Sequence, residues 1–177
     1  MIMHVYERVS TVVNEVLVVL SSRAKYKQYE RYLGRELLRL DEFPSHTPLI
    51  GAYTGFKHVN SEYSFLLSCD TPLLSVKILL LLLNTTRNAN AVIPRHPNNY
   101  VEPLQAIYRT RDALEASHQA LISGRLNLRS MIDLLDHVVY LPTDRIKEFD
   151  PQLLTFLNVN TKSDLKRAEK ILSECLL

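Results

Sequence analysis

Short apolar runs of about strand length recur along the chain and alternate with segments of helical period. Most of these runs are continuous rather than alternating, as expected for strands covered on both faces of a parallel sheet. We predict strands at 15–21, 36–40, 63–68, 89–94, 102–108 and 137–141, and a strand end at 156–161. We predict helices at 1–13, 23–33, 49–58, 75–84, 110–122, 128–135 and after 161.

The alternation of strand and helix predicts an α/β fold with a mostly parallel sheet, helices on both faces and right-handed crossovers. No linker or internal repeat interrupts the pattern. We therefore expect residues 1–177 to form a single domain, and 46% hydrophobic residues are enough to build a sizeable core.

Composition excludes several classes of protein. A formal net charge of +2 is too small to indicate a nucleic-acid or membrane partner. Cys69 and Cys175 lie far apart without metal-ligand spacing, so a reducing compartment is the default. The longest apolar run, 78–83, is far shorter than the roughly 20 residues of a membrane span, and no cleavable signal sequence opens the chain. We expect a cytoplasmic protein; the sequence says nothing of its oligomeric state.

Two acids follow predicted strands directly. Asp70 ends the apolar run that begins at Tyr63, and Asp41 precedes a proline-bearing loop. Open α/β sheets bind ligands just beyond the carboxyl ends of their strands, and a carboxylate there suits Mg²⁺ held against phosphates. An Asp in this position can instead cap the next helix, and the residues alone leave both interpretations open.

Other kinds of chemistry find little support. The histidines lack ligand spacing, no serine lies in a G-x-S-x-G elbow, and neither cysteine has a base nearby in the sequence. Lysines interleaved with tyrosines at 23–33 can bind nucleic acid, but a solvated helix face is the favoured interpretation. Gly51 and Gly55, in the predicted helix at 49–58, would allow close approach of backbone or ligand.

Four motifs in order make the chain resemble the molybdenum cofactor guanylyltransferases, the MobA proteins. The first is Asp41 followed by Thr47-Pro-Leu-Ile-Gly-Ala-Tyr-Thr-Gly55; the others are Phe65-Leu-Leu-Ser-Cys-Asp-Thr-Pro72, Glu102-Pro-Leu-Gln-Ala-Ile-Tyr108 and Phe156-Leu-Asn-Val-Asn-Thr-Lys-Ser-Asp-Leu165. They are similar to that family's Gly-Pro-Leu-Ala-Gly, Cys-Asp-Met/Thr-Pro, Gln-Pro-Leu-x-Ala-x-Tyr and Phe-x-Asn-x-Asn-Thr-x-x-Asp-Leu segments. The likeness spans nearly the whole chain.

The resemblance implies a Rossmann-like, three-layer nucleotidyltransferase fold and a reaction. GMP would pass from GTP to molybdopterin with Mg²⁺ present, and pyrophosphate would leave. By resemblance, Asp70 would be the catalytic residue and magnesium ligand, Asp41 and Gly51 would hold the nucleotide with it, and Asn158 and Asn160 would line the molybdopterin side.

The chain also departs from the family pattern. The family begins with a strand and a Gly-rich, lysine-bearing phosphate loop, which the four glycines here do not supply. We expect a chain truncated at its amino end, without the first central strand between 16–20 and 65–68. Thr47 also replaces the usual Gly, and Ser22 a frequent Asn. Two alternatives stay open: a related nucleotidyltransferase for another cofactor or a sugar phosphate, and a non-catalytic pterin-binding or assembly protein.

Overall fold

The computed structural model describes residues 1–174, which form eight α-helices, six β-strands and two 3₁₀ turns. The strands are β1 (Val18–Leu20), β2 (Leu38–Leu40), β3 (Tyr63–Leu67), β4 (Ala91–Arg95), β5 (Gln105–Arg109) and β6 (Val138–Pro142). The α-helices are α1 (Ile2–Val9), α2 (Arg23–Tyr29), α3 (Pro48–His58), α4 (Val76–Thr85), α5 (Thr110–Ile122), α6 (Leu128–Ile132), α7 (Thr143–Lys147) and α8 (Lys162–Glu174). The 3₁₀ turns are η1 (Arg35–Leu37) and η2 (Leu154–Phe156).

Four strands form one mixed sheet in the order β3-β5-β4-β6. β3, β4 and β6 run in one direction, and β5 is antiparallel to both of its neighbours. The α/β class and a mostly parallel strand direction are confirmed, and β5 is the exception. The physical reason is the connection from β4 to β5, because residues 96–104 are fewer than the dozen or so that a parallel crossover needs.

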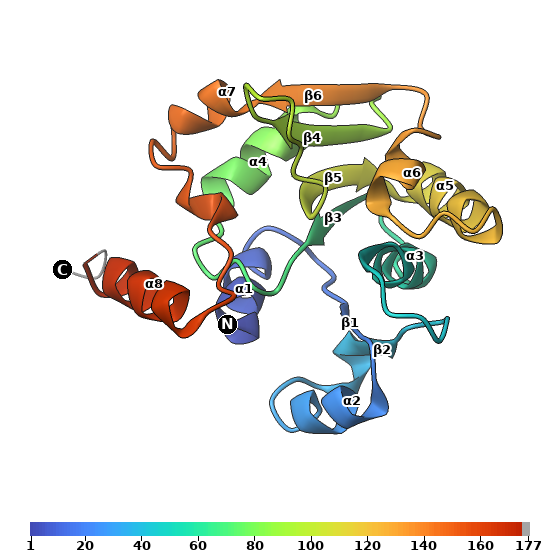
Figure 1. Ribbon diagram of the computed structural model, residues 1–177, viewed down its shortest axis with the longest axis horizontal. Coiled ribbons are helices and arrows are strands. Elements are labelled where there is room, and N and C mark those ends of the chain that lie inside the picture. The colour runs from blue at the N-terminus through green and yellow to red at the C-terminus, as the bar shows by residue number, and fades with distance from the viewer. Residues whose placement is uncertain (175–177) are drawn as a thin grey trace.

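Helices cover this sheet on both faces, which confirms the three-layer architecture (Figure 1). Ala91 and Tyr108 pack into a core with α3, α5 and α6, whereas Val92 and Ile107 face α4. Each of the four is at most 1% exposed. Neighbouring strand residues point to opposite faces, so each central strand serves two cores at once and reads as a continuous apolar run.

β1 and β2 form a separate parallel pair, which lies with α2 apart from the larger sheet (Figure 1). The buried residues of this small unit are Leu20, Leu33 and Leu38. Over residues 1–174, no ladder joins β1 to β3.

Some local predictions are wrong. The helix from Arg23 ends at Tyr29, and Gly34 has extended backbone before η1 instead of stopping the helix. The strand end predicted at 156–161 is a 3₁₀ turn followed by coil. β3 was expected to be covered on both faces, yet all of its residues are partly exposed, because it lies at the edge of the sheet. The short helix α7 has no counterpart among the predictions.

Candidate active site

Asp70 lies three residues beyond β3, in a turn that polar contacts hold in place. The Ser68 hydroxyl donates a hydrogen bond to the Asp70 carboxylate. The Thr71 hydroxyl donates to the Ser68 carbonyl at 3.1 Å and accepts from the buried Gln105 amide at 2.6 Å. Ser75 is the N-cap residue of α4, the helix that follows. Asp70 is partly exposed, and it does not cap that helix.

Asp41 follows β2 and is the more enclosed of the two acids. Its backbone N–H donates to the Leu20 carbonyl of β1 at 3.1 Å, and its side chain is only 8% exposed. Burial raises the pKa of this carboxyl, while His46, 3.9 Å away, and Lys25 counteract the rise. A side chain at Gly51 would begin 3.8 Å from the Asp41 carboxylate. Two of the three residues predicted to hold the nucleotide, Asp41 and Gly51, therefore lie side by side.

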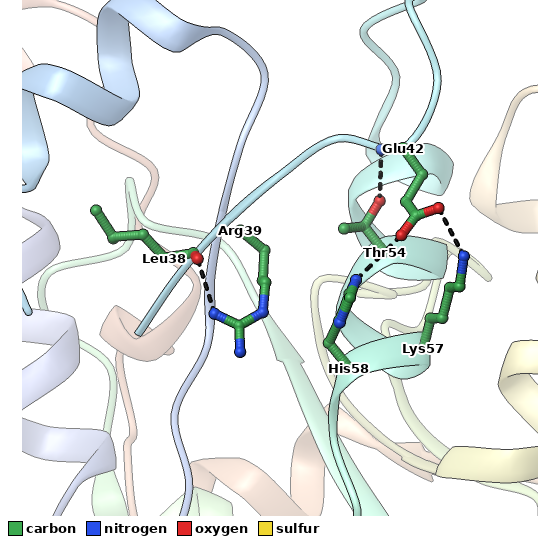
Figure 2. A network of polar contacts seen from close by, with 6 residues as sticks. All are labelled: Leu38, Arg39, Glu42, Thr54, Lys57 and His58. Atoms are coloured by element: carbon green, nitrogen blue, oxygen red, sulfur yellow. Dashed lines mark hydrogen bonds and ion pairs between the residues drawn. The ribbon is translucent and has the colours of Figure 1, made fainter. Parts of the chain in front are cut away.

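A polar network ties the segment after Asp41 to α3, and Figure 2 shows it. The Glu42 N–H donates to the hydroxyl of the fully buried Thr54 at 3.1 Å. Lys57 and His58 contact the Glu42 carboxylate at 2.7 and 3.0 Å, and they lower its pKa through hydrogen bonds. Because the backbone is held at Glu42, the position of Asp41 over Gly51 is fixed from one side.

Lys25, in the first turn of α2, acts electrostatically on Asp41 and on Cys69. The Ser22 hydroxyl accepts from the Lys25 N–H at 3.3 Å and so caps the helix that carries it. Cys69 is exposed as a residue, but partial loss of solvation raises the pKa of its thiol. The negative charge of Asp70 raises this pKa further, and the positive charge of Lys25 lowers it. Since Lys25 also acts on Asp41, its ammonium lies within electrostatic reach of both strand ends. The sequence pattern at 23–33 predicted a solvated helix face and gave Lys25 no role. Only its position shortly after a predicted strand indicated a site.

The segment with the two asparagines returns to Asp70. The Val159 N–H donates to the Asp70 carbonyl at 2.8 Å. Val159 is 7% exposed and packs with Leu73, whereas Asn158 and Asn160 on either side of it are exposed. The amides therefore point away from the core at the edge where Asp70 lies. The Thr161 hydroxyl accepts from the Asp164 N–H at 3.1 Å and caps the start of α8.

A histidine and an acid form a partly buried pair in the loop between β4 and β5. His96 Nε2 lies 2.9 Å from Glu102 Oε1, and the His96 ring contacts Phe156, two residues before Asn158, with 5.6 Å between ring centroids. Burial raises the pKa of Glu102, and the bond to His96 opposes this. The lack of ligand spacing among the histidines gave no sign of this pair.

The site thus consists of two groups of residues. Asp41 and Gly51 form one, and Asp70 with the 158–160 segment forms the other. Across residues 1–174, no three His, Cys, Asp or Glu side chains gather as a preformed metal site. None of the helices formed by these residues is long and apolar enough to cross a membrane. Cys175 lies outside the described residues.

Comparison with known proteins places the chain in a family of nucleotide-using transferases. Residues 1–138 match the MobA-like NTP transferase domain, and the chain belongs to that family. The molybdenum cofactor guanylyltransferase of Desulfosudis oleivorans is 28% identical over 169 residues, which cover 96% of this chain and 80% of that protein. The probable molybdenum cofactor guanylyltransferase of Methanosarcina mazei is 31% identical over 165 residues, covering 90% and 73%.

A solved structure agrees with this assignment. The crystal structure of molybdopterin-guanine dinucleotide biosynthesis protein A from Archaeoglobus fulgidus superposes with a TM-score of 0.80 at 27% identity. The match covers 98% of this chain and 85% of that chain. The family resemblance and the fold class predicted from the four motifs are therefore confirmed.

Proposed function

We propose that this protein transfers GMP from GTP to molybdopterin and releases pyrophosphate. The observation that carries the proposal is the hydrogen bond from Val159 to the Asp70 carbonyl, which brings the asparagine segment to the carboxylate at the end of β3. The names of the relatives support the same reaction.

The small sheet would hold the nucleotide. An ionised Asp41 only accepts hydrogen bonds, so it would bind donor groups of the guanine nucleotide. Gly51 has no side chain to fill the space beside that carboxylate, and a bound nucleotide can therefore approach the backbone of α3 closely. Lys25 acts electrostatically on Asp41 and on Cys69, the residue before Asp70, and would supply positive charge to a triphosphate.

The large sheet would hold the magnesium ion. Asp70 and Ser68 offer the oxygen ligands that Mg²⁺ prefers, and one or two carboxylates suffice when substrate phosphates complete the shell. This donor set fits an ion that arrives with the nucleotide. When bound, Mg²⁺ supplies charge neutralisation at the phosphates and favours departure of pyrophosphate.

The transfer itself needs no protein nucleophile. An oxygen of the molybdopterin phosphate forms a bond to the α-phosphorus of GTP while the bond to the α–β bridging oxygen breaks, and pyrophosphate leaves with those electrons. The chain's part is to position the two substrates in line. Asn158 and Asn160, both exposed on the same side of the segment, offer amide donors and acceptors to the pterin.

The test incubates the purified chain with GTP, magnesium chloride and molybdopterin, and follows the guanine dinucleotide by chromatography and pyrophosphate by a coupled assay. Equal amounts of both products are expected, at a rate that depends on magnesium. Parallel reactions contain CTP in place of GTP, or a sugar phosphate in place of molybdopterin. A higher rate with either substitute would favour a related nucleotidyltransferase. Pterin binding without pyrophosphate release from any nucleotide would favour a non-catalytic protein. Either result would contradict the proposal.

A further inference from the structure

The loop between β4 and β5 carries a carboxylate to which the proposed function assigns no role. Leu67, the last residue of β3, pairs with Gln105, the first residue of the antiparallel β5. Residues 96–104 therefore lie at the carboxyl edge of the sheet, where Asp70 follows β3. Ligands of open α/β sheets bind at this edge. In this loop the side chain of Glu102 is only 17% exposed, so an acid is kept half-buried where a substrate would bind.

Hydrogen bonds join one side of the loop to the turn of Asp70. The Ser68 N–H donates to the Leu104 carbonyl at 3.0 Å. The Gln105 side-chain amide donates to the Thr71 hydroxyl at 2.6 Å, and both of these side chains are buried. The loop and the turn are therefore held against each other next to the proposed magnesium ligand.

The other side of the loop touches the segment with the two asparagines. The His96 ring packs against the ring of Phe156, with 5.6 Å between their centroids. Phe156 lies two residues before Asn158. The loop that carries Glu102 thus contacts both the turn of the proposed magnesium ligand and the segment proposed for the pterin.

Glu102 is fixed in place by its backbone and by its side chain. Its N–H donates to the Pro94 carbonyl at 3.0 Å, and its own carbonyl accepts from the Gln105 N–H at 3.1 Å. His96 Nε2 lies 2.9 Å from Glu102 Oε1. An ionised carboxylate only accepts hydrogen bonds, so the histidine is the donor in this contact. The carboxylate is therefore oriented before any ligand binds.

Part of this carboxylate remains available to a ligand. The buried side-chain atoms without a hydrogen-bond partner are Thr47 Oγ1, Gln105 Oε1 and Thr143 Oγ1. Glu102 Oε2 also has no partner within residues 1–174, and since it is not one of those buried atoms, solvent reaches it. A carboxylate offers about four lone-pair sites, and His96 uses one of them. Both oxygens can therefore still accept from a ligand with two donors side by side.

Stability of the loop does not account for this pair. Burial raises the pKa of Glu102 more than the bond to His96 lowers it, so the pair does not recover the full cost of desolvation. Partly exposed ion pairs contribute little to stability in any case. Titratable groups kept under such conditions cluster at functional sites. The family's motif has Gln at this position, so the carboxylate is a feature of this chain.

We propose that Glu102 recognises the 2-amino-4-oxo edge of the pterin ring of molybdopterin and that His96 positions it. A pterin presents its 2-amino group and its N3–H side by side as two donors, and the two oxygens of a carboxylate match them in a bidentate pair. A ring with an oxygen at position 2 would place an acceptor against the carboxylate. The inference rests on the proposed function and names the group that selects the ring of the acceptor substrate.

Guanine carries the same pair of donors, so location decides between the two substrates. The loop of Glu102 contacts the asparagine segment through Phe156. The proposed nucleotide contacts, Asp41 and Gly51, lie at the end of β2 and in α3. We therefore assign Glu102 to the pterin, and GTP binding provides the check.

The test measures binding of 6-hydroxymethylpterin phosphate and of its lumazine analogue, which has oxygen in place of the 2-amino group. Both ligands fluoresce, and the titrations use a pH at which both rings are neutral. The unmodified chain should bind the pterin at least roughly tenfold more tightly than the lumazine, because only the pterin offers two donors. The result would be a direct measure of recognition at position 2 of the ring.

Glu102→Gln should reverse this preference. Its amide has one acceptor and one donor, which complement the N3–H and the 2-oxo group of lumazine. Pterin binding should weaken roughly tenfold, since a hydrogen bond to a charged group is lost. Lumazine should then bind at least as tightly as the pterin, while GTP binding stays unchanged. The new side chain can still accept from His96, so the melting temperature should not fall.

Two further variants separate recognition from structure. Glu115→Gln removes an exposed acid paired with Arg111, and as the matched control it should keep the affinity and the preference for the pterin. His96→Phe keeps an aromatic ring against Phe156 and removes the hydrogen bond to Glu102. It should weaken pterin binding less than Glu102→Gln does, and the pterin should still be preferred.

Three results would overturn the proposal. An unchanged preference in Glu102→Gln would remove the carboxylate from recognition of the ring. A larger loss for GTP than for the pterin would make Glu102 a contact of guanine. Failure of the unmodified chain to bind the pterin phosphate would leave the loop without this ligand. Transfer of GMP with an unchanged preference contradicts this inference alone, whereas a reversed preference without transfer contradicts the proposed reaction alone.

Discussion

The two sheets carry the two halves of the candidate site, but they differ greatly in strand length and in the size of their buried cores. The strands of the larger sheet have five residues each, and helices bury its central residues on both faces. β1 and β2 have three residues each, and their apolar cluster contains only three buried residues. Two-stranded sheets are marginal by themselves. Asp70 therefore follows a strand of the sheet with a large core, whereas Asp41 follows a strand of the sheet with a small core.

This difference indicates which of the two acids is held more firmly by the fold. In the proposed function Asp70 must be placed accurately against phosphates, and it follows a strand of the sheet with the larger core. Asp41, the proposed nucleotide contact, lies on the unit with the smaller core. The polar contacts from Glu42 to α3 compensate in part, because they tie the small sheet to a helix of the larger core.

The largest effect on activity is expected from a substitution at Asp70. Asp70→Asn should lower the rate of GMP transfer by roughly 100-fold or more, because the amide is a much weaker magnesium ligand and charge stabilisation by a metal amounts to several kcal/mol. The Ser68 hydroxyl can still donate to the amide oxygen, so the melting temperature should not change. Asp133→Asn, which removes an exposed acid paired with Arg129, is the control. Full activity in the Asp70 variant would remove the residue from the mechanism.

Hydrogen exchange measures the difference between the sheets directly. Amides in β4 and β5 should exchange at least roughly tenfold more slowly than those in β1 and β2, since local opening requires less buried surface to be exposed in the small sheet. Mass spectrometry of peptic fragments gives both rates in one experiment. Equal protection in the two units would show that they unfold together and would contradict the comparison.

The two asparagines test the substrate side of the larger sheet. Replacing Asn158 and Asn160 together by Ala should weaken molybdopterin binding about tenfold and leave GTP binding nearly unchanged, because each amide contributes hydrogen bonds of about 1 kcal/mol. Both side chains are exposed, so the fold should tolerate their loss. Calorimetry with each ligand gives the comparison. Equal losses for both ligands would reject the assignment of this segment to the pterin.

Two neighbouring acids of the smaller unit should respond to pH with opposite sign. Burial raises the pKa of Asp41, so its contribution to stability is present below the unfolded value of 3.8 and is lost as the pH rises through the folded pKa. Asp41→Asn should therefore raise the melting temperature at pH 7, by on the order of 2 °C, while it weakens GTP binding. The gain should vanish on acidification.

Glu42 provides the matched control for that experiment. Lys57 and His58 lower its pKa through hydrogen bonds, so its contribution is present above the unfolded value of 4.5 and is lost as the pH falls through the folded pKa. Glu42→Gln should lower the free energy of unfolding at pH 7 by less than about 1 kcal/mol, and the melting temperature should fall slightly. Thermal melts of both variants between pH 3 and 8 test the two signs, and shifts in the same direction would contradict them.

The amino-acid pattern predicted the periodic elements best. The helices at α3 and α5 match their predicted bounds within a residue, and Gly124, with φ of 72°, follows α5 as a left-handed stop. The direction of β5 was missed, although the absence of a helical pattern between 96 and 104 already argued for an antiparallel turn. Strand periodicity is the same in both directions, so only the connection carries that information.

The site was predictable only where a motif marks it. Asp41, Gly51 and Asp70 lie at strand ends or helix starts, as their motifs indicated. Lys25 and His96 come from segments without a distinctive pattern, and the interactions of Lys25 with Asp41 and of His96 with Glu102 appear only in the fold. Local spacing gave no sign of either interaction.

The bond between Val159 and Asp70 also has a consequence for how the protein is made. A chain leaves the ribosome from its amino end, and early units fold before later ones appear. The strands β3, β4, β5 and β6 are all synthesised before Val159, so the larger sheet can pair on the nascent chain while the turn at Asp70 still lacks its last partner. The turn at Asp70 is thus completed only after every strand of the larger sheet has been synthesised.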